Sequence, residues 1–146
     1  MYLLDTNFCS RVILGDATAI SRLKGIDAAE LATLSIVRGE LIYMAEKSEQ
    51  RARNLTFVHA FLQRFHSYPV DNDTGDIYGR LKAELMRRFG PREKSKRIKT
   101  AIQQLGFTDN DLWIAATAIQ HGLTVVSADT DFQRMNEVHS FPVEAW

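Results

Sequence analysis

The stretch Tyr2-Leu-Leu-Asp-Thr-Asn7 joins a short apolar run to three residues that favour turns and helix N-caps. It predicts a buried strand whose carboxyl end leads directly into a helix over 8–14. Leu123-Thr-Val-Val-Ser127 is a second apolar run of this kind, and acidic residues follow it closely. Short apolar strands that alternate with helices are typical of a parallel sheet covered by helices on both faces.

The rest of the chain continues this alternation. Leu31-Ala-Thr-Leu34 predicts a further strand, and Ser35 after it fits a helix N-cap. Apolar residues spaced three and four apart predict amphipathic helices farther along. The predicted strands span 2–4, 31–34, 68–70 and 123–127. The predicted helices span 8–14, 17–24, 36–47, 55–65, 94–105, 111–120 and 132–135, together with a long helix that has cap candidates at 71–74 and an apolar stripe over 77–89. We therefore predict a three-layer α/β/α sandwich with a short parallel sheet of four to five strands.

Length and composition limit what the chain can be. Its 146 residues predict a single domain over 1–146. The only cysteine, Cys9, excludes a disulfide framework and suits a reducing compartment. No apolar run approaches the roughly 18 residues that a membrane span requires, and the first residues lack the basic and apolar regions of a signal peptide. We expect a cytoplasmic protein without a membrane partner.

Equal numbers of basic and acidic residues, 18 of each, conceal a separation of charge along the chain. Between Met86 and Lys99 stand seven basic residues and one acid, whereas six acids and one base follow from Ala101 onward. A polyanion-binding surface beside a metal site would produce this pattern. A solvated basic helix next to an acidic surface would produce it equally well.

Acidic residues stand where ligands bind in parallel sheets, outside the carboxyl ends of the strands. They occupy four places: Asp5 after the first strand, Glu40 in the helix after the second, Asp111 at the start of its helix, and Asp129 with Asp131 after the last strand. Each acid alone is explained by helix capping, a turn or an exposed helix surface. The order of the elements could nevertheless bring all four places to one edge of the sheet.

Carboxylates gathered in this way would repel one another. Two of them ~4 Å apart do so by ~4 kcal/mol at an effective dielectric near 20, so a cluster takes up protons or a cation. Oxygen ligands without Cys or His suit Mg²⁺ or Mn²⁺, and such an ion promotes phosphodiester hydrolysis by lowering the pKa of a bound water and orienting the phosphate. Thr6, Asn7 and Ser127 can hydrogen-bond the ligands or water.

Four motifs, in this order and spacing, carry a family resemblance. They are Tyr2-Leu-Leu-Asp-Thr-Asn7, Ile36-Val-Arg-Gly-Glu-Leu41, Asn110-Asp-Leu-Trp-Ile-Ala-Ala-Thr-Ala118 and Thr124-Val-Val-Ser-Ala-Asp-Thr-Asp-Phe132. With them the chain resembles PIN-domain ribonucleases and, more narrowly, the VapC-type toxins of toxin–antitoxin pairs. The resemblance runs the full length of the chain.

The resemblance implies a parallel α/β/α sandwich and Mg²⁺-dependent endonucleolytic cleavage of RNA. It also implies frequent homodimers and inhibition by a cognate antitoxin protein. By position it identifies the catalytic and metal-binding acids as Asp5, Glu40, Asp111 and Asp129. Asp131 is a close second for the fourth place, because relatives also carry an acid directly before the Phe.

Two features depart from the family pattern. Ser127 stands where Thr is usual, and it keeps the hydroxyl. The stretch 92–107 is longer than the loop of many relatives, and it holds basic residues that could contact RNA or the antitoxin: Arg92, Lys94, Lys96, Arg97 and Lys99. A solvated helix that packs only Ile98, Ile102 and Leu105 is an equally good interpretation.

Two other functions stay open on the sequence alone. An aspartyl-phosphate-type phosphatase also places a nucleophilic Asp after its first strand, but it usually needs a second Asp two residues later, where this chain has Asn7. A non-catalytic PIN-like module that binds RNA or protein would not need all four acids. We therefore predict an endoribonuclease that uses Mg²⁺ or Mn²⁺ and acts as a toxin restrained by an antitoxin.

Overall fold

The computed structural model describes all 146 residues and contains one five-stranded sheet. Its strands are β1 (Tyr2–Leu4), β2 (Leu31–Leu34), β3 (His66–Tyr68), β4 (Thr124–Val126) and β5 (Val143–Glu144). Every neighbouring pair is parallel, and the order across the sheet is β3-β2-β1-β4-β5. The predicted parallel sheet of four to five strands is confirmed.

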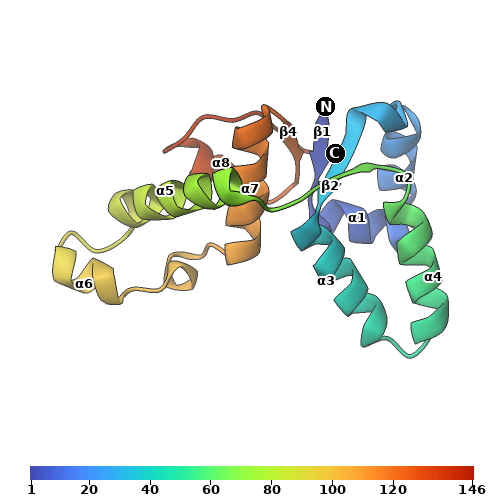
Figure 1. Cartoon of the computed structure of the whole chain (residues 1–146), viewed down its shortest axis with the longest axis horizontal. Coiled ribbons are helices and arrows are strands. Elements are labelled where there is room, and N and C mark those ends of the chain that lie inside the picture. The colour runs from blue at the N-terminus through green and yellow to red at the C-terminus, as the bar shows by residue number, and fades with distance from the viewer.

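Helices cover both faces of this sheet (Figure 1). The helices α1, α2 and α4 lie on one side, and α5, α7 and α8 lie on the other. None of the helices is both long and apolar enough to cross a membrane. The bounds are α1 (Thr6–Ile13), α2 (Ala17–Lys24), α3 (Ser35–Glu46), α4 (Arg51–Leu62), α5 (Asn72–Phe89), α6 (Lys94–Lys99), α7 (Asp109–His121) and α8 (Thr130–Asn136), with 3-10 turns η1 (Ala28–Glu30) and η2 (Ile102–Leu105).

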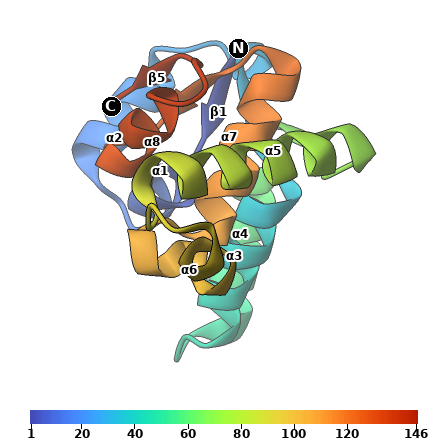
Figure 2. The same ribbon diagram turned by 90° about the vertical axis from the view of Figure 1, so that its left-hand side faces the viewer.

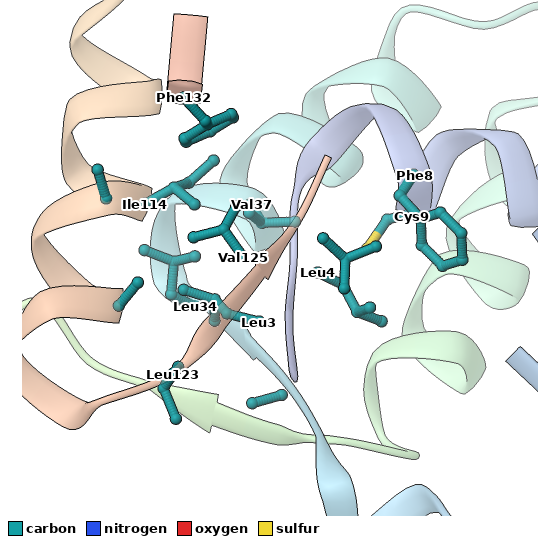
Figure 3. Packing of buried hydrophobic residues seen from close by; sticks show 14 of the residues in the cluster. Leu3, Leu4, Phe8, Cys9, Leu34, Val37, Ile114, Leu123, Val125 and Phe132 are labelled. Carbon is teal, nitrogen blue, oxygen red and sulfur yellow. The ribbon is translucent and has the colours of Figure 1, made fainter. Parts of the chain in front are cut away.

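The core has two halves because successive residues of a strand point to opposite faces. Leu3 lies with Leu34 and the α7 residue Ile114 on one face, whereas Leu4 lies with Phe8 of α1 on the other (Figure 3). All five side chains are buried. Burial on both faces explains why the central strands are continuous apolar runs rather than alternating ones.

The strand order creates a switch point between β1 and β4, which are neighbours in the sheet. After β1 the chain enters α1 on one face, and after β4 it enters α8 on the other. Chain segments that diverge in this way leave a crevice at the carboxyl ends of the two strands, where ligands bind in open α/β sheets. Asp5 and Ser127 are the first residues after these strands.

Three predicted elements are corrected by the structure. The third strand is His66–Tyr68 rather than 68–70, because Pro69 has no N–H to extend the ladder. The predicted helix over 94–105 is interrupted, since Thr100 and Ala101 are extended and separate α6 from η2. Ser35 is the first residue of α3 instead of its N-cap, and its hydroxyl donates to the carbonyl of Tyr68 at 3.3 Å.

The last strand, β5, was not predicted as a separate element. It has only two residues, Val143 and Glu144, and Glu144 is exposed, so no apolar run marks it. Its backbone still completes the sheet, because the Ser127 N–H donates to the carbonyl of Glu144 at 2.9 Å. This bond also fixes the chain where β4 ends.

Candidate active site

Asp5 occupies the switch point and is almost fully buried, with 2% of its surface exposed. Its carboxylate accepts a 2.6 Å hydrogen bond from the Phe8 N–H and so caps α1. Burial raises the pKa of Asp5 above its ordinary value, hydrogen bonds from Ser127 and the Phe8 N–H oppose the rise, and the charges of Asp129 and Glu40 add to it. Asp5 therefore does cap α1, but capping does not explain why this buried carboxylate lies beside other acids.

Asp111 lies in the first turn of α7, just after the N-cap residue Thr108. The Thr108 hydroxyl donates to the Asp111 carboxylate at 2.6 Å and accepts from the Asp111 N–H at 3.1 Å. Burial is the main cause that raises the pKa of Asp111 to about 6, and the Thr108 bond opposes it. The other upward causes are the negative charges of Asp129, Asp5 and Glu40.

Glu40 joins three helices at the same place. It lies on α3, and its carboxylate accepts a hydrogen bond from Thr6 of α1 and a 2.6 Å bond from the amide of Asn110 on α7. Asn110 was not predicted as a site residue. Its sequence signals are its position beside Asp111 and its place at the start of the motif 110–118. Thr6 was predicted to hydrogen-bond the metal ligands or water, and in the structure its hydroxyl donates to Glu40.

The turn after β4 separates the roles of Asp129 and Asp131. The Asp129 carboxylate caps α8 by accepting the Asp131 N–H at 2.9 Å, and the Asp129 N–H donates to the hydroxyl of Ser127 at 3.0 Å. Its charge acts on Asp5, as described above. The Asp131 carboxylate instead pairs with Arg134 at 2.8 Å.

The structure thus brings four of the predicted acids together and leaves other predicted residues outside the group. Asn7 is exposed, and its side chain bonds none of the acids. Asp131 is engaged by its own helix. The acids that act on one another are Asp5, Glu40, Asp111 and Asp129.

The chemistry of this acid cluster fits a hard divalent cation. Its donors are carboxylate oxygens from four segments of the chain, and the ion pairs of the protein involve other acids, so no Lys or Arg neutralises the cluster. Uncompensated carboxylates of this kind attract a cation. No three acidic, histidine or cysteine side chains already surround one point. Two of the carboxylates instead accept hydrogen bonds from the neutral donors Thr108 and Asn110.

A second polar cluster anchors the start of α7 beside the acids. The Asp109 carboxylate accepts hydrogen bonds from the Tyr78 hydroxyl, from Lys82 at 2.7 Å and from Gln103 at 2.6 Å. The Tyr78 ring stacks on Trp113 with centroids 3.8 Å apart. Residues of α5, η2 and α7 therefore meet at Asp109, two residues before Asp111. The sequence contains no local signal for this cluster, because its members are widely separated.

The basic residues at 92–99 lie apart from the acids. The helix α6 lies beyond the end of α5 (Figure 1), and in both views it is on the side toward which the carboxyl end of β1 points (Figure 2). Arg97 donates to the carbonyl of Pro91 at 2.9 Å and so closes the turn before α6. Ile98 is 77% exposed, which corrects the expectation that it packs with Ile102.

Comparisons with known proteins agree with this arrangement. A model of the PIN domain matches residues 2–138. Ribonuclease VapC2 of Haemophilus influenzae is 31% identical over 99% of this chain and 97% of its own length. The tRNA(fMet)-specific endonuclease VapC of Salmonella typhimurium is 28% identical with the same coverage.

Solved structures give the same result. VapBC from Salmonella typhimurium bound to DNA matches with a TM-score of 0.79 and 29% identity, over 99% of this chain and 97% of the other. VapBC2 from Rickettsia felis bound to a promoter fragment matches with a TM-score of 0.79 and 26% identity, over 99% and 98%. The match to ribonucleases over nearly the whole chain decides against the phosphatase and against a non-catalytic module. The chain belongs to the PIN-domain family, among the VapC-type toxin endoribonucleases, and is an RNA-cleaving hydrolase.

Proposed function

We propose that Asp5, Glu40, Asp111 and Asp129 are the catalytic residues of this ribonuclease and that together they hold Mg²⁺ or Mn²⁺. The observation that carries the proposal is their mutual electrostatic interaction at the switch point of the sheet, without a basic partner. PIN-domain ribonucleases generally depend on a divalent metal. The donor set favours a hard ion.

A bound divalent ion would supply an activated water and neutralise charge that develops on the phosphate. The chain's own residues set the geometry for this chemistry. Thr6 and Asn110 hold Glu40 between α1 and α7, and Thr108 orients Asp111. Partners of this kind fix the direction of a ligand before an ion arrives. Ser127 plays the same part for Asp5, and its hydroxyl also accepts the backbone N–H of Asp129 in the turn after β4.

Asp129, rather than Asp131, is our choice for the fourth acid. The ion pair of Asp131 with Arg134 supports this choice, because a carboxylate with a cationic partner has less need of a metal. Arg134 also donates to the carbonyl of Leu105 at 2.9 Å and lies over the Phe107 ring, 4.2 Å from its centroid. Asp131 and Arg134 together connect α8 to the segment that precedes α7.

Cleavage of RNA by the purified chain tests the proposed function. We expect cleavage that requires Mg²⁺ or Mn²⁺, stops with a chelator, and is absent from Asp111→Asn. Asp76→Asn is the matched control, because Asp76 is an exposed residue on α5 without a hydrogen bond of its own. Cleavage by Asp111→Asn at the wild-type rate would overturn the assignment of the site.

We also propose that the exposed basic residues near α6 bind the RNA backbone, since their helix lies on the side of the molecule toward which the carboxyl end of β1 points. Two relatives are named as tRNA(fMet)-specific endonucleases, which supports a structured RNA as substrate. Replacing Lys94, Lys96 and Lys99 by Ala should weaken RNA binding and flatten its salt dependence, with a slope reduced by about 0.7 for each phosphate that is no longer neutralised. Arg97 is left intact because it closes a turn. An unchanged slope would contradict the proposal.

An antitoxin protein is the proposed partner, as in the VapBC complexes that this fold matches. A groove of about 460 Å³ between α1, α3 and α4 is lined mostly by apolar residues and adjoins a second of about 380 Å³, with Ile13 and Phe57 in both. Leu14 there is 78% exposed. Arg53 lines the first groove and Arg64 the second. We propose that an antitoxin segment with apolar and acidic side chains binds in these grooves.

Leu14→Asp tests this surface without touching the acids. It should abolish binding of the cognate antitoxin while RNA cleavage is retained. Unimpaired binding would contradict the location.

We further propose that the chain forms a homodimer, which sedimentation of the free protein checks, and that it acts in the cytoplasm, where an RNA-cleaving toxin and its antitoxin would meet.

A further inference from the structure

A shallow groove adjoins the acid cluster along α3. Its volume is about 500 Å³, and its lining includes Ser35, Ile36, Gly39, Tyr43 and two residues of the site, Glu40 and Asn110. This volume lies in the range of about 300–1,000 Å³ that is usual for small-molecule sites. Because Glu40 and its hydrogen-bond donor Asn110 belong to both, a ligand in the groove would lie directly beside the acids.

One stripe of α3 carries the groove. Ile36, Glu40, Tyr43 and Lys47 follow one another at intervals of four, three and four residues, so they lie on the same helix face. Tyr43 is 64% exposed, although it is a large aromatic residue. Lys47 places its ammonium group 4.9 Å from the centre of the Tyr43 ring. The stripe therefore runs from an acid of the site to an exposed aromatic ring over which a positive charge lies.

Gly39 directly precedes Glu40 and lies four residues before Tyr43, and its lack of a side chain leaves space in the groove. A Cβ atom built at Gly39 would have no heavy atom within 4 Å. Its helical position requires no positive φ, so backbone conformation does not demand glycine there. A larger side chain at this position would enter the groove without meeting the protein.

We propose that this groove is a nucleotide subsite, in which Tyr43 stacks on a base of the RNA next to the cleaved phosphate and Lys47 faces the backbone of that nucleotide. Stacking on an exposed aromatic ring and a neighbouring cation are the two contacts that bind single-stranded nucleic acid without reading its sequence. Phosphate requires the positive charge that Lys47 supplies and that the acids lack. The inference rests on the proposed location of the catalytic acids.

Abasic substitution of the RNA tests the proposal most sharply. Once the cleaved bond of a short RNA is known, the base on each side of it is removed in turn. We expect Tyr43→Ala to lower kcat/KM on the intact RNA roughly tenfold, and removal of one of these bases to lower it similarly for the wild type. Tyr43→Ala acting on that abasic RNA should show little further reduction, since either change already abolishes the stacking of ring on base.

Three further variants complete the test. Tyr43→Phe and Tyr43→Trp should retain cleavage, because they keep an aromatic face, and Gly39→Leu should raise KM by filling the groove. Asp76→Asn is again the control, since Asp76 is an exposed residue that lines none of the three grooves. An unchanged kcat/KM for Tyr43→Ala, or an equal reduction on intact and abasic RNA, would overturn the subsite.

Two other outcomes are also decisive. If Tyr43→Ala converts a dimer into a monomer in sedimentation, the groove is covered by a second copy of the chain and the proposal is wrong. Asp111→Asn, measured in the same assay, separates this inference from the proposed function. Full activity of that variant would refute the catalytic site itself, whereas an inactive Asp111→Asn with an unaffected Tyr43→Ala refutes the subsite alone.

Discussion

Asn110 donates a 2.6 Å hydrogen bond to Glu40 and so ties the start of α7 to α3 at the carboxyl edge of the sheet. Glu40 accepts a second hydrogen bond from Thr6, directly after Asp5. Three segments that are distant in sequence are thereby fixed around one carboxylate. The position of each acid consequently depends on neutral residues beside it as much as on its own helix.

Removal of this amide should impair catalysis more than folding. Asn110→Ala leaves Glu40 with one hydrogen bond instead of two, and loss of a partner of this kind typically lowers metal affinity or activity about 10- to 100-fold. We expect such a loss in RNA cleavage with a melting temperature close to that of the wild type. Asn54→Ala, which removes an α4 amide bonded to Ser48 beyond the C-terminal end of α3, should cleave normally. Equal activity of the two variants would rule out a positioning role.

In the absence of metal, the protein should become less stable as the pH rises. Because the pKa of Asp111 is raised from 3.8 to about 6 in the folded protein, the native state binds more protons than the unfolded state between these values. Stability therefore falls as the pH rises from about 4 to about 6 and stays lower above it. Asp5, whose pKa is also raised, contributes in the same direction.

Asp111→Asn isolates this contribution. The variant should melt at a higher temperature than the wild type at pH 7, where Asp111 is ionised, and the difference should shrink toward pH 5, where the carboxyl group takes up a proton. Thermal unfolding in the presence of a chelator measures both values. A variant that is less stable than the wild type at pH 7 would contradict the expectation that ionised Asp111 destabilises the fold.

Asp129→Asn should lose most of the RNA cleavage, whereas Asp131→Asn should retain it. Asp129 acts electrostatically on Asp5 and Asp111, so its neutral variant should lose about 100-fold or more in kcat, in line with the several kcal/mol that a bound ion contributes. Asp131→Asn should retain cleavage and lose at most about 1 kcal/mol of stability, because its ion pair with Arg134 is partly exposed. Loss of cleavage in Asp131→Asn alone would reverse the assignment.

Thr33 carries the one buried side-chain polar atom that has no hydrogen-bond partner. Its hydroxyl lies inside β2, with no exposed surface. Thr33→Val keeps the shape and removes the unpaired group, so it should stabilise the fold by about 1 kcal/mol in chemical denaturation.

Thr74→Val is the matched control for this prediction. Thr74 is equally buried, but its hydroxyl bonds Asp71 at 2.9 Å and also bonds Gln120. The same substitution should therefore destabilise the fold by about 1–2 kcal/mol. A change of the same sign at both positions would contradict the difference in hydrogen bonding.

The sequence predicted the parallel sheet, and it singled out four acids that the structure brings near one another, because both depend on local patterns. Apolar runs such as Leu123-Thr-Val-Val-Ser127 mark buried strands, and the rule for parallel sheets directs attention to the residues after them. Residues whose role depends on tertiary contacts had no such pattern. Asn110 is an ordinary helix-start residue until α3 places Glu40 beside it, and Asp109 has a role only because Lys82 reaches it from α5.

The segment after α5 shows the limit of periodicity. Ile98 and Ile102 stand at helical spacing, yet Ile98 is 77% exposed and Ile102 is buried. Extended backbone at Thr100 and Ala101 rotates the two halves of the segment relative to each other. Neither a threonine nor an alanine prevents a helix from continuing, so the residue types did not predict this interruption. The packing of Arg134 against Phe107 fixes the later half separately.

Calorimetric titration of the purified chain with Mn²⁺ and with Mg²⁺ tests the central claim most directly. We predict saturable binding by the wild type and by Asp76→Asn, and its loss in the folded variants Asp5→Asn and Asp111→Asn. Wild-type affinity in those two variants, or no uptake of either ion by the wild type, would contradict a metal site built from these carboxylates.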